Sequence, residues 1–123
     1  MKIMYVASEA LPYASTGGLA DVIGSLPKAV KKERGDDADI RVVIPYYAST
    51  REKFGDQLEL VCETTVRLSW RNQYCGIFKT VSDGITFYFI DNRYYFDRKM
   101  LYGNYDDGER FAFFSKCVLE LMS

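Results

Sequence analysis

The stretch "YASTGGLADVIGSLPKAVKKERG" (residues 13–35) places two adjacent glycines, Gly17 and Gly18, directly before an amphipathic segment. The apolar residues of this segment recur at helical spacing: Leu19, Val22, Ile23, Leu26 and Val30. This spacing gives a helix one apolar face and predicts a helix from about residue 18 to residue 34. Gly35 is a suitable residue to end it, because glycine is common just after the last helical turn.

An apolar segment lies on each side of this predicted helix. "KIMYVA" (2–7) is short and almost continuously apolar, which predicts a buried strand. "DIRVVIPYY" (39–47) predicts a second strand that ends near Pro45. A strand, a helix and a further strand form a βαβ unit, whose crossover is right-handed and makes its two strands parallel.

The pattern changes after this unit. Three strand-like segments follow at 57–69, 74–81 and 85–91, and their short connections predict antiparallel hairpins. An aromatic and polar loop then covers 92–107, and Asp106 with Glu109 resembles a capping box at the start of a last helix. We therefore predict an α/β fold with a Rossmann-like, open, mostly parallel sheet and an antiparallel hairpin region.

The last helical pattern has no stop signal before Ser123, so we expect the chain to be part of a larger protein. Its 123 residues suffice for one domain with its own core. A net charge of −1 argues against nucleic acid as a partner, since phosphate affinity needs a surplus of lysine and arginine. No signal peptide or membrane-spanning stretch is evident, so we expect a cytoplasmic protein with no membrane partner.

The residue types also limit the chemistry that we expect. The chain has three cysteines without C-x-x-C spacing and no histidine, which disfavours a zinc site and a Cys–His or Ser–His nucleophile. It has no pair of carboxylates with D-x-D spacing that would hold a divalent metal ion. We therefore expect neither a metal nor a cofactor.

The glycine turn has two interpretations. A turn from a strand into a helix gathers unpaired backbone N–H groups and the positive end of the helix dipole, which together hold phosphate. Glycine would let a ligand approach that backbone closely. Alternatively, Gly17 and Gly18 only let the chain turn, Gly24 packs the helix on the sheet, and Asp21 is an acid that favours a helix start. Neither G-x-G-x-x-G nor a Walker A motif is present, so the residues alone predict an α/β domain with a candidate anion site.

Longer motifs carry a family resemblance. "KIMYVASEALPYASTGGLADVIGSLPKAV", "DIRVVIPYY" and "YYFDRKMLYGNYDDGERFAFFSKCVLELM" resemble, in this order, the amino-terminal part of bacterial glycogen synthases and plant starch synthases. The resemblance implies an ADP-glucose-dependent α-1,4-glucan synthase of GT-B fold (glycosyltransferase family 5). Residues 1–123 would be its truncated amino-terminal, acceptor-side domain, and the carboxy-terminal domain with most donor contacts would be absent. The reaction implied is transfer of glucose from ADP-glucose to the non-reducing end of an α-1,4-glucan with retention.

The resemblance also implies the donor-binding residues. Gly17 and Gly18 match the glycines whose backbone faces the donor's pyrophosphate and glucose. Asp21 matches an acid near the transferred sugar, and Tyr102 matches a tyrosine on the donor side of the cleft. Ser15 stands where the family usually has a lysine that pairs with donor phosphate. No residue of this segment is expected to be catalytic, and the segment alone is expected to be inactive.

Ser15 leaves three explanations open. The cation could come from elsewhere in the chain, the donor preference could be altered, or the protein could be a weakened paralogue. Two alternative functions follow: a GT-B transferase that uses a different sugar nucleotide, and a non-catalytic glucan-binding paralogue. The aromatic residues Tyr94, Tyr95 and Phe96 could stack on sugar rings or simply be buried against strands.

Overall fold

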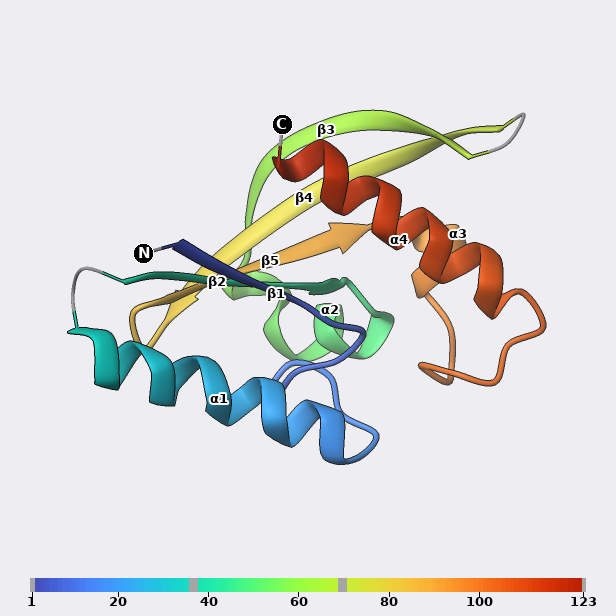
Figure 1. Cartoon of the computed structure of the whole chain (residues 1–123). Helices are drawn as coiled ribbons and strands as arrows, with labels where there is room; N and C mark the ends of the chain where they lie inside the picture. Colours follow the sequence, from blue (N-terminus) through green and yellow to red (C-terminus); the bar gives the residue numbers. More distant parts are fainter. Residues whose placement is uncertain (1, 36–37, 69–70, 123) are drawn as a thin grey trace.

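The computed structural model of the chain describes residues 2–35, 38–68 and 71–122. The described elements are, in chain order, β1 (Lys2–Val6), α1 (Gly18–Arg34), β2 (Asp39–Pro45), α2 (Ala48–Phe54), the 3₁₀ helix η2 (Gly55–Gln57), β3 (Glu59–Leu68), β4 (Arg71–Ser82), β5 (Ile85–Asp91), α3 (Arg93–Phe96) and α4 (Asp107–Met122) (Figure 1). Both predicted helices and the predicted strands are present, although β4 begins three residues before the predicted segment 74–81, and residue 69 of the predicted segment 57–69 lies outside the described residues. α2, η2 and α3 add helical turns that the sequence did not predict.

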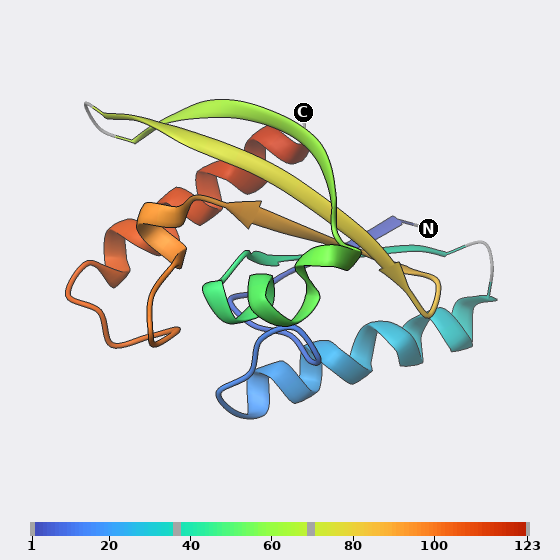
Figure 2. The ribbon, with the colours of Figure 1, turned by 180° about the vertical axis from the view of Figure 1, so that it is seen from behind.

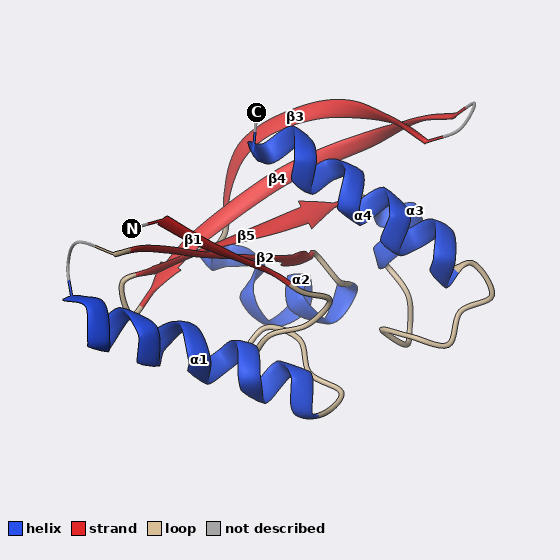
Figure 3. Cartoon of the chain, in the orientation of Figure 1, coloured by secondary structure: helices blue, strands red, loops and turns tan. Residues whose placement is uncertain are grey.

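The strands form one sheet in the order β1-β2-β5-β4-β3 (Figure 3). β1 pairs with β2 and β2 with β5 in parallel, while β4 is antiparallel to both β5 and β3. Among these five strands β4 alone therefore runs in the opposite direction. The α/β class, the parallel βαβ unit and the antiparallel hairpin region are confirmed.

Helices cover both faces of the sheet (Figures 1 and 2). α1 and α2 lie on one face, where a core cluster includes Val42, Ile44 and Phe87. α4 and α3 lie on the other face, over a second cluster that includes Val43 and Ile90. Successive residues of β2 thus point into different clusters, as the twofold period of a strand requires.

β1 differs from the buried strand that its apolar sequence predicts. It lies at the edge of the described sheet, its three central residues are half-buried, and its end residues Lys2 and Val6 are exposed, Val6 by 49%. β2 lies between two strands and is buried over most of its length. A near-continuous apolar sequence is compatible with an edge strand such as β1 and with a central strand such as β2. The sequence shows that the strand is hydrophobic but not which elements cover its two faces.

The parallel strands β1, β2 and β5 end at the same edge of the sheet. Residues Ala7–Gly17 follow β1, Tyr46 and Tyr47 follow β2, and Asn92 follows β5. Ligands of open α/β sheets collect outside this carboxyl edge, because loops and helix starts converge there. The predicted site residues lie in segments that begin at this edge.

Candidate functional site

Glu9 lies in the loop after β1 and is a buried carboxylate, with 2% of the residue exposed. It accepts hydrogen bonds from the Thr16 hydroxyl (2.6 Å), the backbone N–H of Ala20 in the first turn of α1 (3.2 Å) and the Tyr102 hydroxyl (3.0 Å). A buried charge is tolerable only with such donors. Glu9 therefore ties the start of α1 to the distant loop that carries Tyr102.

Tyr102 is half-buried and faces this junction. Burial raises the pKa of its hydroxyl, so the group keeps its proton at neutral pH. That proton is donated to Glu9, and the Ser8 hydroxyl, 2.6 Å from the Tyr102 oxygen, is then the donor in their contact. Tyr47, which follows β2, donates to the Ser8 carbonyl at 2.6 Å. The ends of β1 and β2 and the Tyr102 loop are thereby joined through Ser8.

The loop at 97–107 is held from inside by Arg110, which is fully buried. Its guanidinium donates to the Leu101 carbonyl (2.9 Å), to the Asp107 carboxylate (2.8 Å) and to the Tyr95 carbonyl. Asp107 in turn accepts the backbone N–H of Gly103 at 2.8 Å, where the chain turns with a φ of 84°. The backbone on both sides of Tyr102 is thus fixed by charged side chains.

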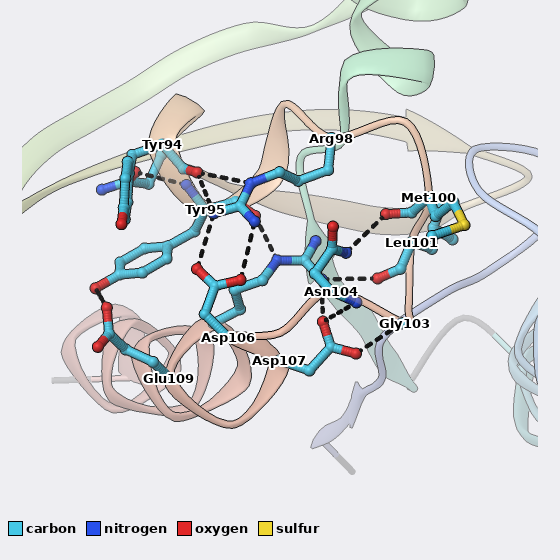
Figure 4. Close-up of polar contacts among 12 residues, drawn as sticks. Tyr94, Tyr95, Arg98, Met100, Leu101, Gly103, Asn104, Asp106, Asp107 and Glu109 are labelled. Carbon is cyan, nitrogen blue, oxygen red and sulfur yellow. Dashed lines mark hydrogen bonds and ion pairs between the residues drawn. The ribbon is translucent and has the colours of Figure 1, made fainter.

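The predicted capping box at the start of α4 is wrong. Asp106 accepts both terminal nitrogens of Arg98, each at 2.9 Å, and Glu109 accepts the Tyr95 hydroxyl at 2.6 Å (Figure 4). Burial and the bond to Glu109 raise the pKa of Tyr95 to about 12, which keeps this donor protonated. The two N–H groups of a guanidinium bind a carboxylate more strongly than a backbone amide does, because the guanidinium and the carboxylate carry opposite charges.

The glycine turn has open backbone. Gly17 lies before the helix with an extended φ of 176°, and neither Gly17 nor Gly18 has a positive φ. A Cβ at either position would meet no atom within 4 Å. Within the described parts of the chain, the N–H groups of Gly17, Gly18 and Leu19 form no hydrogen bond, and no side chain caps α1. The conformation of this turn therefore does not require glycine.

Gly24 packs against the loop after β1 and not against the sheet, which corrects the predicted role. A Cβ at Gly24 would come within 2.9 Å of the Leu11 Cβ and 3.4 Å of the Leu11 carbonyl oxygen. The Leu11 N–H also donates to the Ala20 carbonyl at 3.1 Å. The loop that carries Glu9 and Ser15 is therefore pressed closely onto α1.

A cleft of about 700 Å³ opens beside this junction. Its lining comes from three segments: residues 11–16 of the loop after β1, Ser49 and Lys53 of α2, and residues 99–102. The charged residues among them are Lys53 and Lys99, both exposed. No ion pair of either lysine occurs within residues 2–35, 38–68 and 71–122. The cleft is therefore lined by two lysines and, among the described residues, by no acidic residue.

The structure brings two of the predicted residues to the cleft. Ser15 and Tyr102 line it from opposite segments. Gly17, Gly18 and Asp21 do not line it; they are exposed at the adjoining start of α1, with Thr16 between the glycines and the cleft. The side chain of Asp21 has no ion pair with another described residue.

Sequence reasoning missed Glu9, Lys53 and Lys99. One signal was available for Glu9, because "SEA" follows a strand directly and polar residues at such a position face the carboxyl edge of the sheet. The two lysines gave no comparable signal, since each is a single cation in a polar segment. Of the three aromatic residues considered for sugar stacking, Tyr95 and Phe96 are fully buried and only Tyr94 is exposed, by 54%.

The described residues show neither a cluster of metal ligands nor a membrane-spanning helix. No group of three or more histidine, cysteine, aspartate or glutamate side chains lies together there in a way that could hold a metal ion. None of the described helices is long and apolar enough to cross a membrane.

Comparisons with known proteins agree with this architecture. The family model for the starch synthase catalytic domain matches residues 2–123. The chain is 53% identical over 122 residues to the glycogen synthases of Streptococcus pneumoniae strains Hungary19A-6 and CGSP14, covering 99% of this chain and 25% of theirs. A solved structure, the catalytic domain of starch synthase IV from Arabidopsis thaliana bound to ADP and acarbose, superimposes with a TM-score of 0.79 at 25% identity over 97% of this chain and 24% of that one.

The chain thus spans about a quarter of the length of these relatives. The match over nearly all of its residues, the identity to the bacterial glycogen synthases and the α/β sheet shared with the plant structure lead to one assignment. This chain belongs to the glycogen and starch synthase family, glycosyltransferases whose catalytic-domain model it matches from residue 2 to residue 123.

Proposed function

We propose that this chain is the amino-terminal, acceptor-side part of a GT-B enzyme that transfers glucose from ADP-glucose to the non-reducing end of an α-1,4-glucan. One observation carries the proposal: the charged residues lining the cleft are the two cations Lys53 and Lys99, next to a helix start with unpaired amides. Such a combination favours a diphosphate, because helix-end N–H groups and cations both stabilise phosphate oxygens. A cytoplasmic location belongs to the same proposal.

The named relatives support the choice of substrates. The bacterial relatives are named glycogen synthases, and the Arabidopsis structure is bound to ADP and acarbose. We extend a nucleotide-sugar donor and a glucan acceptor from those proteins to this one. The remaining domain, with most donor contacts, would lie outside residues 1–123, so we predict no transfer activity for these residues alone.

The proposed donor-binding roles are those that the family resemblance implies. The amides of Gly17 and Gly18 would approach the pyrophosphate, and Asp21 would lie near the transferred glucose. Tyr102 would line the donor side of the cleft, with its orientation set by Glu9. Amides fixed at the leaving oxygen would stabilise the charge that develops on ADP as the glycosidic bond breaks.

We propose that Lys53 or Lys99 supplies the cation that Ser15 does not. Both line the same cleft as Ser15, from α2 and from the loop before Tyr102. A cation that reaches the diphosphate from another segment would replace the lysine that the family usually has at position 15. Ser15 would then offer its hydroxyl to a phosphate oxygen, a weaker contact than a charged group makes.

The test is transfer of labelled glucose from ADP-glucose to glycogen by the full-length protein that contains this chain. We expect both Lys99→Ala and Lys53→Ala to raise the KM for ADP-glucose. In the variant with the larger effect the KM should rise by about 10-fold or more, the loss expected for one charge-assisted contact. Lys32→Ala, which removes an exposed lysine at the far end of α1, is the matched control and should change nothing.

Three outcomes would contradict the proposal. Transfer from UDP-glucose but not ADP-glucose would favour a GT-B enzyme with another donor. Glycogen binding without transfer, with activity restored by Ser15→Lys, would favour a non-catalytic paralogue. Normal KM values in both lysine variants would remove these two cations from the donor site.

A further inference from the structure

Free cysteines lie where α4 packs on the sheet, and the proposed glucose transfer uses none of them (Figure 1). Cys75 on β4 and Cys117 on α4 are fully buried, whereas Cys62 on β3 is exposed. Cys75 and Cys117 belong to the same core cluster, the one between α4 and the sheet. These two residues therefore place a thiol of a helix and a thiol of a strand in one apolar layer.

The thiols of Cys75 and Cys117 are hydrogen-bonded to each other. The bond from Cys117 lowers the pKa of Cys75, because a donated proton stabilises a thiolate there. The bond to Cys75 and burial raise the pKa of Cys117, which therefore keeps its proton. A single buried cysteine packs as a small apolar residue. Two sulfur atoms in contact, one of them favoured as a thiolate, are in addition a dithiol that can form a disulfide.

Cys62 connects this buried pair to the solvent through the neighbouring strand. β3 and β4 are antiparallel, and Thr64 lies opposite Cys75 in their register. Cys62 precedes Thr64 by two residues and therefore lies on the same face of the sheet, the face that α4 covers. Diagonal neighbours of an antiparallel pair lie about 7–8 Å apart, so a small shift of either strand brings the sulfur atoms of Cys62 and Cys75 together.

We propose that Cys75 and Cys117 are a redox-active pair, which a low-molecular-weight disulfide such as glutathione disulfide oxidises through Cys62. The Cys62 thiolate attacks one sulfur of the small disulfide, forms a mixed disulfide with it and releases the first reagent thiolate. Cys75 then attacks the Cys62 sulfur and releases the second reagent thiolate. Cys117 loses its proton and attacks the Cys75 sulfur, and the displaced Cys62 thiolate takes up a proton. In total Cys75 and Cys117 lose two electrons and two protons, and the small disulfide is reduced to two thiols.

The disulfide would act on the candidate site through α4. Arg110 lies on the buried side of α4, about two helical turns before Cys117. Arg110 holds the loop of Tyr102 through its bond to the Leu101 carbonyl, at 2.9 Å. A covalent bond from Cys117 to β4 would keep α4 on the sheet and would thus limit the opening of this loop. In the reduced protein α4 is held by non-covalent contacts, so the loop opens more readily.

The experiment treats the full-length protein with glutathione disulfide, alkylates the remaining thiols and maps the disulfides by mass spectrometry after digestion with trypsin. Trypsin cleaves after lysine and arginine, so it releases the three cysteines in separate peptides: 54–67, 72–79 and the one that begins at residue 117. We expect the second and third peptides to be joined by a disulfide in the major oxidised species. Dithiothreitol should separate them again.

Cysteine variants of the same protein test each step of the exchange. Cys117→Ala should stop at a disulfide between Cys62 and Cys75, which joins peptides 54–67 and 72–79. Cys75→Ala should stop at a mixed disulfide of Cys62 with glutathione. Alanine keeps both core positions apolar, and urea unfolding of the two reduced variants checks that they fold. Cys62→Ser changes an exposed residue and should slow the buried disulfide by about 10-fold or more, because the buried thiols then react only when α4 opens.

Hydrogen exchange measures the effect on α4. Oxidation should slow the exchange of the α4 amides in the unsubstituted protein but not in Cys117→Ala. The inference is overturned if glutathione disulfide modifies Cys62 alone in the unsubstituted protein, or if the peptides of Cys75 and Cys117 stay separate. A buried disulfide that forms equally fast in Cys62→Ser would refute the route through Cys62. None of these measurements uses glucose transfer, so their result is independent of the proposed function.

Discussion

The Glu9 side chain joins several segments of the candidate site. Its two oxygens accept donors from the loop after β1, from the start of α1 and from Tyr102, residues up to 93 positions apart in the chain. The unpaired amides of Gly17 and Gly18 lie directly between two of these donors, Thr16 and Ala20. The position of the proposed phosphate-binding backbone therefore depends on a residue that does not itself line the cleft.

This dependence predicts the effect of Glu9→Gln. The amide keeps the size of the side chain but loses the charge and one acceptor oxygen, so one donor from Thr16, Ala20 or Tyr102 is left without a partner. We expect a loss of about 1–3 kcal/mol in the free energy of unfolding, measured with urea, and a higher KM for ADP-glucose in the full-length protein. Glu33→Gln, at an exposed glutamate of α1, should change neither quantity.

At the scale of single residues, it was the family resemblance that predicted donor-binding roles for Ser15 and Tyr102. Both residues line one cleft, and their donor-binding roles stay a prediction. The residues alone predicted only the turn at Gly17 and Gly18. Lys53 and Lys99 were out of reach because their approach to Ser15 depends on the paths that the short helix α2 and the irregular loop before Tyr102 take in space. Such paths leave no periodic trace in a sequence.

The packing of α1 on the loop after β1 gives a prediction at the scale of elements. Gly24→Ala would place a Cβ 2.9 Å from the Leu11 Cβ, an atom that cannot move without the backbone. Although alanine favours helix by about 1 kcal/mol, we expect a net loss of about 1–2 kcal/mol from overpacking. Gly108→Ala in the first turn of α4 meets no atom within 4 Å and should be neutral or stabilising. Urea unfolding of both variants measures the difference, and equal stabilities would contradict the close contact.

The elements themselves were largely predictable, each for a local reason. α1 follows from a stripe of apolar residues, and the turn between β4 and β5 follows from Asp83 and Gly84, whose φ values of 53° and 76° suit a tight hairpin. The capping box at Asp106 failed because a distant arginine, Arg98, binds that carboxylate. Local patterns predict elements well when no charge from elsewhere competes for the same atoms.

At the scale of the whole molecule, the carboxylates around the Tyr102 loop predict acid sensitivity. The hydrogen bond from Arg98 lowers the pKa of Asp106; burial raises the pKa of Asp107, but Arg110 and the Gly103 amide outweigh burial and lower it. A lowered folded-state pKa stabilises the fold above the unfolded value of about 3.9, and this contribution is lost as pH falls through the folded-state pKa. Burial raises the pKa of Asp91, whose contribution is instead lost as pH rises.

We therefore expect the urea midpoint to fall as the pH drops below about 4, with a shallower fall in Asp106→Asn. The asparagine in Asp106→Asn has no carboxylate to protonate on acidification. The bond of this side chain to Arg98 therefore does not change with pH, and part of the pH dependence disappears. Asp56→Asn removes an exposed carboxylate without an ion pair among the described residues and should keep the full dependence. Identical pH profiles for all three proteins would contradict the role of the Arg98–Asp106 pair.

The half-exposed β1 has a practical consequence for handling the protein. One of its sides is bonded to β2, and within the described sheet no strand saturates the peptide groups on its other side. An unpaired strand edge of this kind can form hydrogen bonds with a strand of another molecule, and the exposed Val6 adds an apolar contact. Preparations limited to residues 1–123 should consequently self-associate at high concentration, and a lysine introduced at Val6 should keep them dispersed.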